Sequence, residues 1–392
     1  PAPAEAEAPP ASAEPEAAPA PAWSDGDHAT GTWGGARRRL AAAGVTIDAI
    51  ASSDLFTAHG AGAALGHLDL AVTVDTDHAG LWAGGTLYVL GQTNVGHGID
   101  DQVGSAQPVT NLEAEPYTQL TELFVEQAIA DDRVRVRVGK QDANRDFGTP
   151  RFGGNFINND FGMFPTAPLP SYPTTGLGAL VAVKPVGWAT ARVGVYEASP
   201  EVGGLGLTTA FRAGGGSLVA GSVAVTHTVG AAGGSGGTTT LGAWREQHEV
   251  DDLTAAEPAT FDRAAGVFVQ HDERLYAHPD APDDPRGLTA IVRLGWAQAD
   301  RSDVSRYAGA SLAWHGVGPR TNDTVGVGGG ALRVTRPLGG GAGPATERFV
   351  EAFYKLRLTP FASLQPDLQW FRQPGGDGRD AVVAGLRVKL KL

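Results

Sequence analysis

Residues 143–175 contain a mixture of side chains that could bind a small polar molecule. They read ANRDFGTPRFGGNFINNDFGMFPTAPLPSYPTT and combine Arg, Asn and Asp with Phe and Tyr. Amides, carboxylates and guanidinium groups hydrogen-bond sugar hydroxyls, while aromatic rings stack on the C–H faces of a sugar. For any single aromatic ring, packing against the surrounding fold is the alternative that we favour. With the preceding Asp142, the polar candidates are Asn144, Arg145, Arg151, Asn155, Asn158, Asn159 and Asp160, and the stacking candidates are Phe152, Phe156, Phe161, Phe164 and Tyr172.

Motifs of catalysis and of metal binding are absent from the sequence. The ten His show no HExxH or other metal-ligand spacing, and no GxSxG elbow occurs. Gly-rich runs such as GVGGGA lack the Lys and Ser/Thr of a phosphate-binding loop. Carboxylates are numerous, but nothing places two of them at the spacing that glycoside hydrolysis needs. We therefore predict no enzymatic activity, no cofactor and no metal.

The composition excludes further classes of protein. A net charge of −13 argues against nucleic acid as a partner. No apolar run of 18 or more residues is present, so no helix should span a membrane. This does not exclude a membrane β-barrel, whose strands alternate in polarity. The chain has no Cys, so its stability does not depend on disulfides.

The segment 133–141, RVRVRVGKQ, shows the period of two that belongs to an extended strand. Its Arg and Val side chains point to opposite faces. A soluble sandwich would place Val in its core, whereas a membrane barrel would place Val against lipid and Arg in a water-filled lumen. Taken alone, this strand is compatible with both and favours the commoner soluble fold.

The rest of the chain favours the barrel, because it contains about sixteen extended runs of roughly ten residues, the length of a tilted membrane strand. A sandwich of that size would need two domains, and no linker divides them. The predicted strands are 46–56, 67–77, 85–94, 118–129, 133–142, 176–185, 189–198, 217–229, 238–250, 263–275, 287–298, 305–317, 323–335, 348–359, 362–373 and 381–392.

Charges gather on one face of each strand, as expected where the other face meets lipid. In 381–392, AVVAGLRVKLKL, the three cations Arg387, Lys389 and Lys391 share one face of the strand, and most of the Val and Leu residues lie on the other face. A two-residue turn at Asp131–Asp132 pairs Glu126 with Arg137 on the polar side and Val125 with Val138 on the apolar side.

Connection lengths also fit a barrel with short turns at one end and longer loops at the other. The connection 143–175 is the longest, and we expect it to fold back into the lumen. The link after the tenth strand, AHPDAPDDPR, is longer than this rule expects.

The N-terminal region differs from the rest. Residues 1–22 contain almost only Pro, Ala and Glu, and we predict that 1–32 form a disordered periplasmic tether ahead of a barrel domain at 33–392. The simplest account is an exported chain whose signal was removed, and a chain that starts internally is the alternative. WGGARRRLAAAG, residues 33–44, predicts a short helix with a glycine cap.

Several stretches resemble the carbohydrate-selective, OprB-type porin family of bacterial outer membranes. They are residues 33–54, 120–147, 153–162, 171–185 and, most specifically, 351–392, in which LQPDLQW is followed by a PGG turn and AVVAGLR. One departure is the final Leu392, where outer-membrane barrels usually end in an aromatic residue. The resemblance implies an all-β, antiparallel transmembrane barrel of sixteen strands in the outer membrane.

The resemblance further implies passive, selective diffusion of mono- or small oligosaccharides through the pore. The alternatives are a general, non-selective porin and a structural barrel tethered to the cell wall. Expected partners are sugars, outer-membrane lipid and lipopolysaccharide, the assembly machinery and, through the tether, the cell wall, with the barrel a monomer or a homotrimer. From the wall, the inward-facing candidates are Glu122, Glu126, Arg135, Arg137, Glu351, Lys355, Arg357 and Asp367.

Overall fold

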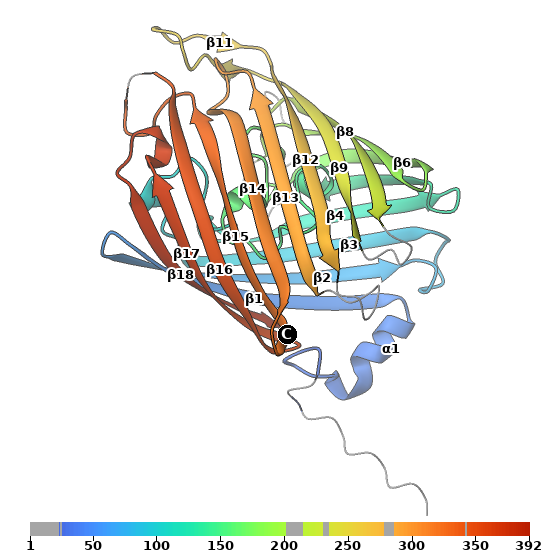
Figure 1. Ribbon diagram of the computed structural model, residues 1–392. Helices are drawn as coiled ribbons and strands as arrows, with labels where there is room; N and C mark the ends of the chain where they lie inside the picture. Colours follow the sequence, from blue (N-terminus) through green and yellow to red (C-terminus); the bar gives the residue numbers. More distant parts are fainter. Residues whose placement is uncertain (1–22, 24–25, 201–214, 230–234, 278–285, 342) are drawn as a thin grey trace, which may run out of the picture.

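The chain forms a closed antiparallel barrel of sixteen strands (Figure 1). The computed structural model describes residues 23, 26–200, 215–229, 235–277, 286–341 and 343–392. The barrel strands are β1 (Val45–Ala58), β2 (Ala61–Asp75), β3 (Gly85–His97), β4 (Tyr117–Ile129), β5 (Val134–Gln141), β6 (Gly176–Val186), β7 (Ala189–Glu197), β8 (Ser217–Val229), β9 (Ser235–Gln247), β12 (Ala264–Ala277), β13 (Gly287–Ala297), β14 (Val304–Val317), β15 (Arg320–Val334), β16 (Ala345–Thr359), β17 (Ala362–Arg372) and β18 (Ala381–Lys391).

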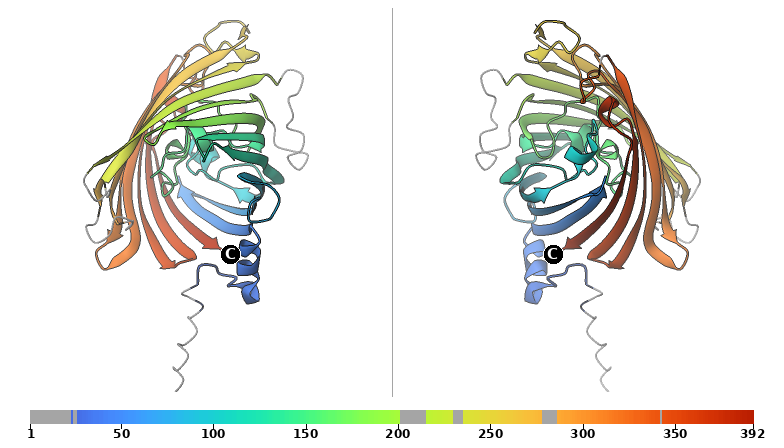
Figure 2. Two further views of the ribbon diagram at one scale, coloured as in Figure 1. Left: turned by 90° about the vertical axis from the view of Figure 1, so that its right-hand side faces the viewer. Right: turned by 90° about the vertical axis from the view of Figure 1, so that its left-hand side faces the viewer.

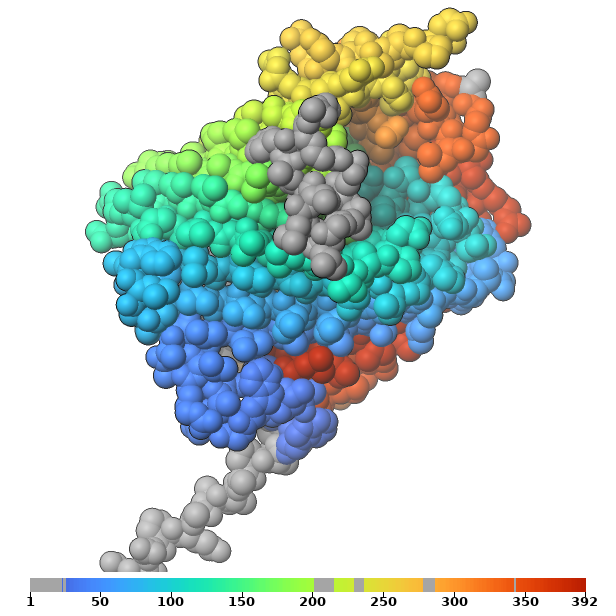
Figure 3. Space-filling model, turned by 180° about the vertical axis from the view of Figure 1, so that it is seen from behind, coloured from blue at the N-terminus to red at the C-terminus, as the bar shows by residue number. Residues whose placement is uncertain are grey.

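Each strand pairs with its neighbour in the barrel sequence, and β1 pairs with β18 to close the wall. Figure 3 shows the result from behind, where neighbouring colours lie as adjacent tilted bands. The predicted all-β barrel of sixteen strands is therefore confirmed. Two details were missed: β2 begins at Ala61 rather than residue 67, and β10 (Val250–Asp251) pairs with β11 (Thr260–Phe261) outside the wall.

Alternating burial along the strands distinguishes two faces of the wall. On β4 and β5, the paired residues Val125 and Val138 are 45% and 54% exposed, whereas Phe124, which precedes Val125 and points to the other face, is only 6% exposed. Apolar side chains thus cover the outside, where lipid would solvate them, and polar chains point inward.

The β4–β5 hairpin has the register that the charge pattern predicts. Glu126 lies opposite Arg137 and Val125 opposite Val138. The turn residues Asp131 and Asp132 have φ of 54° and 63°, the left-handed values that suit the twist of a tight hairpin.

A short helix lies at the turn end of the barrel, near the C-terminus (Figure 1). It comprises the 3₁₀ turn η2 (Trp33–Gly35) and α1 (Ala36–Ala42), which confirms the predicted helix. Arg37 donates to the carbonyl oxygens of Ile47 at 3.1 Å and Leu392 at 2.7 Å, and so joins the helix to the seam between β1 and β18. In the part of the chain described, no helix is long and apolar enough to cross a membrane. Of the tether predicted at residues 1–32, residues 1–22 and 24–25 lie outside the described residues, as does the link at 278–285.

Long connections fill part of the lumen. The segment 142–175 between β5 and β6 lies between opposing walls of the barrel (Figure 2). It carries α3 (Asn144–Phe147) and the 3₁₀ turn η3 (Asn159–Phe161). The core is accordingly formed between this loop and the inward face of the wall, with Phe156, Phe161, Phe349 and Phe353 at its centre.

Candidate functional site

Ion pairs attach the first turn of the 142–175 loop to the wall. Arg137 of β5 bridges Glu126 of β4 at 2.7 Å and Asp146 of α3 at 2.6 Å. Next to it, Arg145 of α3 pairs with the buried Glu122. Arg135, nearer the turn, pairs with Glu126 at 3.2 Å and with Asp132. These four predicted wall residues therefore lie together, and two of them, Arg137 and Glu122, bind the loop directly.

The middle of the loop is attached to the opposite wall. Glu351 of β16 accepts hydrogen bonds from the backbone N–H groups of Ile157, at 2.7 Å, and Asn158, at 3.2 Å. Lys355 donates to the Asn155 side chain at 2.8 Å. Asp367 of β17 lies beside Glu351 and accepts from Gln369 at 3.0 Å. Glu351 and Asp367 are buried beneath the loop, so their surroundings favour an anchoring role.

Arg293 of β13, which sequence reasoning missed, anchors the far side of the loop. Its side chain is fully buried and donates to the carbonyl oxygens of Asp160 at 2.5 Å, Gly148 at 2.7 Å and Met163 at 3.1 Å. The guanidinium carbon also lies 4.0 Å from the centroid of the Phe164 ring. The sequence offered one sign of this role, because Arg293 is the only charged residue in the run TAIVRLGWA, residues 289–297.

The loop aromatics divide into wall-packing and lumen-facing residues. Phe161 is 0% exposed and packs against Phe156 and Phe349, with ring centroids 4.4 and 5.7 Å apart. Its ring is thus largely occupied by packing, as the packing alternative expects, although it also borders the central cavity described below. Tyr172 is half-buried, its hydroxyl donates to Leu112 O at 2.8 Å, and its ring meets His67 edge-on at 5.3 Å. Arg151 is exposed and lies over Phe152 at 5.0 Å.

A second connection, 98–116, also enters the lumen and was not predicted to do so. Arg387 of β18 binds Asp54 of β1 at 2.6 and 2.7 Å and reaches Thr110 of this connection at 2.8 Å. In its helix α2 (Asp100–Val103), burial and the nearby Glu113 carboxylate raise the pKa of Asp100 to about 8. Both loops are thus held by buried polar groups.

A central cavity of about 310 Å³ lies between the loop and four adjacent wall strands. The wall contributes Ser52, His67, Asp69, Gln92, Arg387 and Lys389, and the loop contributes Asp142, Asn144, Met163 and Tyr172 among others. Asp69 Oδ1 accepts from Gln92 Nε2 at 2.7 Å and lies 3.0 Å from His67 Nε2. Carboxylate, amide, cation and aromatic ring therefore meet in one polar space.

Two further cavities flank the central one. The outer cavity, about 410 Å³, lies toward the loop end and is lined by Phe164–Pro168 and by Trp244 and Arg301. The inner cavity, about 160 Å³, lies at the turn end beside Pro360 and Phe361. Met163 lines both the outer and the central cavity, and Lys389 lines both the central and the inner cavity. The three cavities thus follow one another along the barrel.

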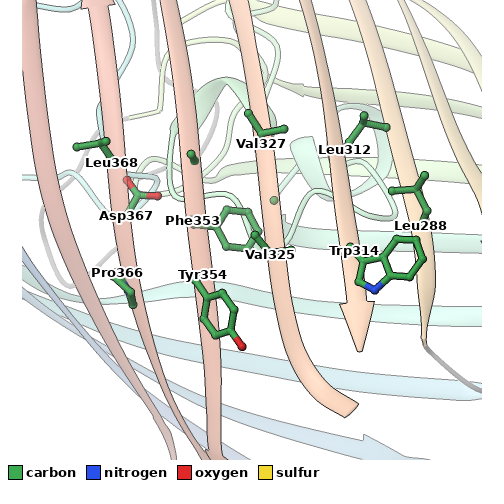
Figure 4. A pocket seen from close by; sticks show the side chains of 12 residues that line it. Leu288, Leu312, Trp314, Val325, Val327, Phe353, Tyr354, Pro366, Asp367 and Leu368 are labelled. Atoms are coloured by element: carbon green, nitrogen blue, oxygen red, sulfur yellow. The ribbon is translucent and has the colours of Figure 1, made fainter. Parts of the chain in front are cut away.

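A further hollow, of about 500 Å³, belongs to the outer wall instead (Figure 4). Its exposed lining residues Leu312, Val327 and Leu368 come from β14, β15 and β17. Because these side chains face away from the lumen, the hollow meets the membrane and is not part of the path.

The predicted site residues therefore fall into three groups. Asp142, Asn144, Phe161 and Tyr172 line the central cavity, while Lys355 and Arg357 line the inner one. The remainder hold or surround the loop, or lie beside the groups that do: Glu122, Glu126, Arg135, Arg137, Arg151, Asn155, Asn158, Asp160, Glu351 and Asp367. Sequence reasoning missed His67, Asp69, Gln92 and Met163. For His67, Asp69 and Gln92, the sequence offered one sign of this role, namely their position on the inward-facing side of β2 and β3.

Around these residues, and in the rest of the described chain, no group of three His, Cys, Asp or Glu could hold a metal ion.

Known structures share the architecture. A high-pH structure of Pseudomonas putida OprB is 19% identical, with a TM-score of 0.85, and covers 94% of this chain and 99% of its own. A low-pH structure of the same protein covers the same shares at 15% identity, with a TM-score of 0.62. No curated protein matches this sequence. The profile of the carbohydrate-selective porin OprB family matches residues 59–392. The chain therefore belongs to the OprB family and is a carbohydrate-selective porin of the bacterial outer membrane.

Proposed function

We propose that sugars diffuse passively through the outer, central and inner cavities in turn, and that the central cavity selects them. The observation that carries this proposal is the mixed lining of the 310 Å³ space. Its volume is at the lower end of the range for small-molecule sites, which favours mono- and small oligosaccharides that pass one unit at a time.

The groups of the central cavity suit neutral hydroxylated solutes. Asp69 Oδ1 is engaged by Gln92 and His67, whereas in the described structure no hydrogen bond reaches Asp69 Oδ2. That oxygen can accept from a sugar hydroxyl, and Lys389 can donate to one. Tyr172 is fixed by its bond to Leu112 and supplies an apolar surface for the sugar C–H groups.

Selection in this proposal comes from contacts made during diffusion, without a chemical step. A general porin would lack the aromatic and hydrogen-bonding preference, and a structural barrel would not conduct. Contacts with lipopolysaccharide, the assembly machinery and the cell wall, as well as the choice between monomer and trimer, stay predictions.

The test is influx into liposomes that contain the purified, refolded protein. We expect glucose to enter faster than an uncharged amino acid of similar or smaller size. Tyr172→Leu should lower glucose influx several-fold and leave amino-acid influx nearly constant, because only the sugar uses the ring.

Tyr276→Leu is the matched control. Tyr276 is 43% exposed and stacks on Trp314 of the lipid-facing wall, outside the path. Equal influx of glucose and the amino acid through the wild-type barrel would contradict selection by the central cavity and would favour the general, non-selective porin. No influx through a folded barrel would point to the structural alternative.

A further inference from the structure

Four cations gather around the inner cavity of about 160 Å³. Lys355 and Arg357 come from β16, and Lys389 and Lys391 come from β18. The other lining groups include Pro360, Phe361 and Ser363, none of which carries a charge. We call these four cations the inner cationic cluster.

Most of this charge is not neutralised. Among the ion pairs of the described residues, the cluster takes part in one, between Lys391 and Asp48 at 3.8 Å. The Lys355 ammonium donates to the neutral Asn155 side chain at 2.8 Å. The Arg357 guanidinium donates to the backbone carbonyls of Thr359 and Pro360.

Two carboxylates lie near the cluster. Asp69 attracts Lys389 and is also engaged by His67 and Gln92. Asp323 lies near the backbone of Arg357. It accepts from the Arg357 backbone N–H at 2.9 Å and from the Tyr354 hydroxyl at 2.8 Å. Its charge is already paired with Arg320. Asp323 therefore does not neutralise the cations that face the cavity.

Two other lumen cations are paired with carboxylates, in contrast to Lys355 and Arg357 of the cluster. Arg387 makes two bonds to Asp54, and Arg137 bridges Glu126 and Asp146. Unpaired cations that crowd a small space repel one another, so an arriving anion is attracted and relieves that repulsion.

The cluster also lies on the path of the solute. Lys389 lines both the central and the inner cavity, so a molecule that leaves the central cavity meets Lys389 first and Arg357 next. A low-dielectric wall around such a cluster concentrates the field of its charges and raises the local concentration of anions.

We propose that the inner cationic cluster binds the carboxylate or phosphate group of acidic and phosphorylated sugars as they pass toward the periplasm. This inference rests on the proposed function and extends its substrates from neutral sugars to anionic ones. The recognised chemistry is an anionic group attached to a sugar ring or a free inorganic anion of the same kind.

The experiment compares influx of radiolabelled glucuronate and glucose into the same proteoliposomes, with the membrane potential clamped. The expected result is a glucuronate-to-glucose ratio above one for the wild-type protein. Arg357→Gln combined with Lys391→Gln should lower that ratio roughly tenfold, the lower end of the range for focusing by a charged cleft.

Lys184→Gln serves as the matched control, because Lys184 is a cation near the same end of the barrel that pairs with Asp132 at 2.7 Å and does not line the inner cavity. This control should leave the ratio unchanged. Inorganic phosphate is the second probe, and it should slow glucuronate influx through the wild-type barrel.

Two results would overturn the proposal: a ratio that the double substitution does not lower, and a glucuronate influx that phosphate does not slow. Failure of the proposed function looks different, since it would appear as equal influx of glucose and an uncharged amino acid. Heat-dependent mobility of each variant on a gel verifies that the barrel is folded.

Discussion

Replacing Arg293 with Met should loosen the 142–175 loop and widen the path. The fully buried guanidinium holds the carbonyl oxygens of Gly148, Asp160 and Met163 from the wall side. Met has a similar length and no donor, so the substitution removes the three hydrogen bonds and leaves most of the packing in place.

The size of the effect follows from what each carbonyl loses. Asp160 O keeps a bond from the Tyr307 hydroxyl at 3.0 Å, so two carbonyls, those of Gly148 and Met163, lose the bond that the structure gives them. An unsatisfied buried group costs about 1–3 kcal/mol. Because Met also removes the desolvation cost of a buried cation, the net loss should be about 3 kcal/mol. That change raises the population of displaced loops roughly a hundredfold.

The assay is influx of a series of sugars of increasing size into liposomes. In Arg293→Met, disaccharide influx relative to glucose should rise several-fold, and the loop should become sensitive to protease. Arg151→Met is the control, because Arg151 lies on the same loop but is exposed, and its guanidinium lies over the ring of the neighbouring Phe152. A folded Arg293→Met barrel with the wild-type size profile and a protected loop would refute the anchoring argument.

Two further predictions concern the loops. Met163 lines both the outer and the central cavity, so Met163→Ala should raise maltose influx relative to glucose several-fold, and an unchanged ratio in the swelling assay would contradict it. The pKa of the Asp100 carboxyl is ordinarily 3.8 and rises to about 8 in the folded loop. The folded loop is therefore most stable below about pH 4, where the carboxyl is protonated in both states, and it loses stability as the pH rises from about 4 to 8. Hydrogen exchange of residues 98–116, corrected for the intrinsic rate, should therefore accelerate over that interval in the wild-type protein. Asp100→Asn, which can still accept from Val109 N–H, should flatten the dependence; an equal slope in both proteins would disprove the assignment.

The wall of the barrel was predictable because lipid imposes a simple rule on every strand. Alternation placed Val125 outside and Glu126 inside, and a one-residue slip would have exchanged them. The start of β2 was missed because AGAALG, residues 61–66, contains only Ala, Gly and one Leu, so polar and apolar residues do not alternate there. The pairing of β10 with β11 was missed because strands of two residues leave no period to detect.

The interior was less predictable, since residue type does not reveal which partner a loop side chain meets. Phe161 and Tyr172 looked alike as stacking candidates, yet Phe161 is fully buried against Phe156 and Phe349 while Tyr172 is only half-buried, and both border the central cavity. The anchoring by Arg293 depends on contacts with residues more than a hundred positions away, and the local sequence does not reveal such contacts.

The same buried contacts set both the stability and the selectivity of this porin. Arg293, Glu351 and Arg137 each bind the 142–175 loop from a different part of the wall, so the loop cannot move without leaving buried polar groups unsatisfied. The position of the loop in turn fixes the width of the central cavity. Substitutions that widen the path through these anchors should therefore also weaken loop docking. A substitution at Arg357 should change which solutes pass without that cost, because its side chain lines the inner cavity and donates to Thr359 and Pro360 and not to the loop.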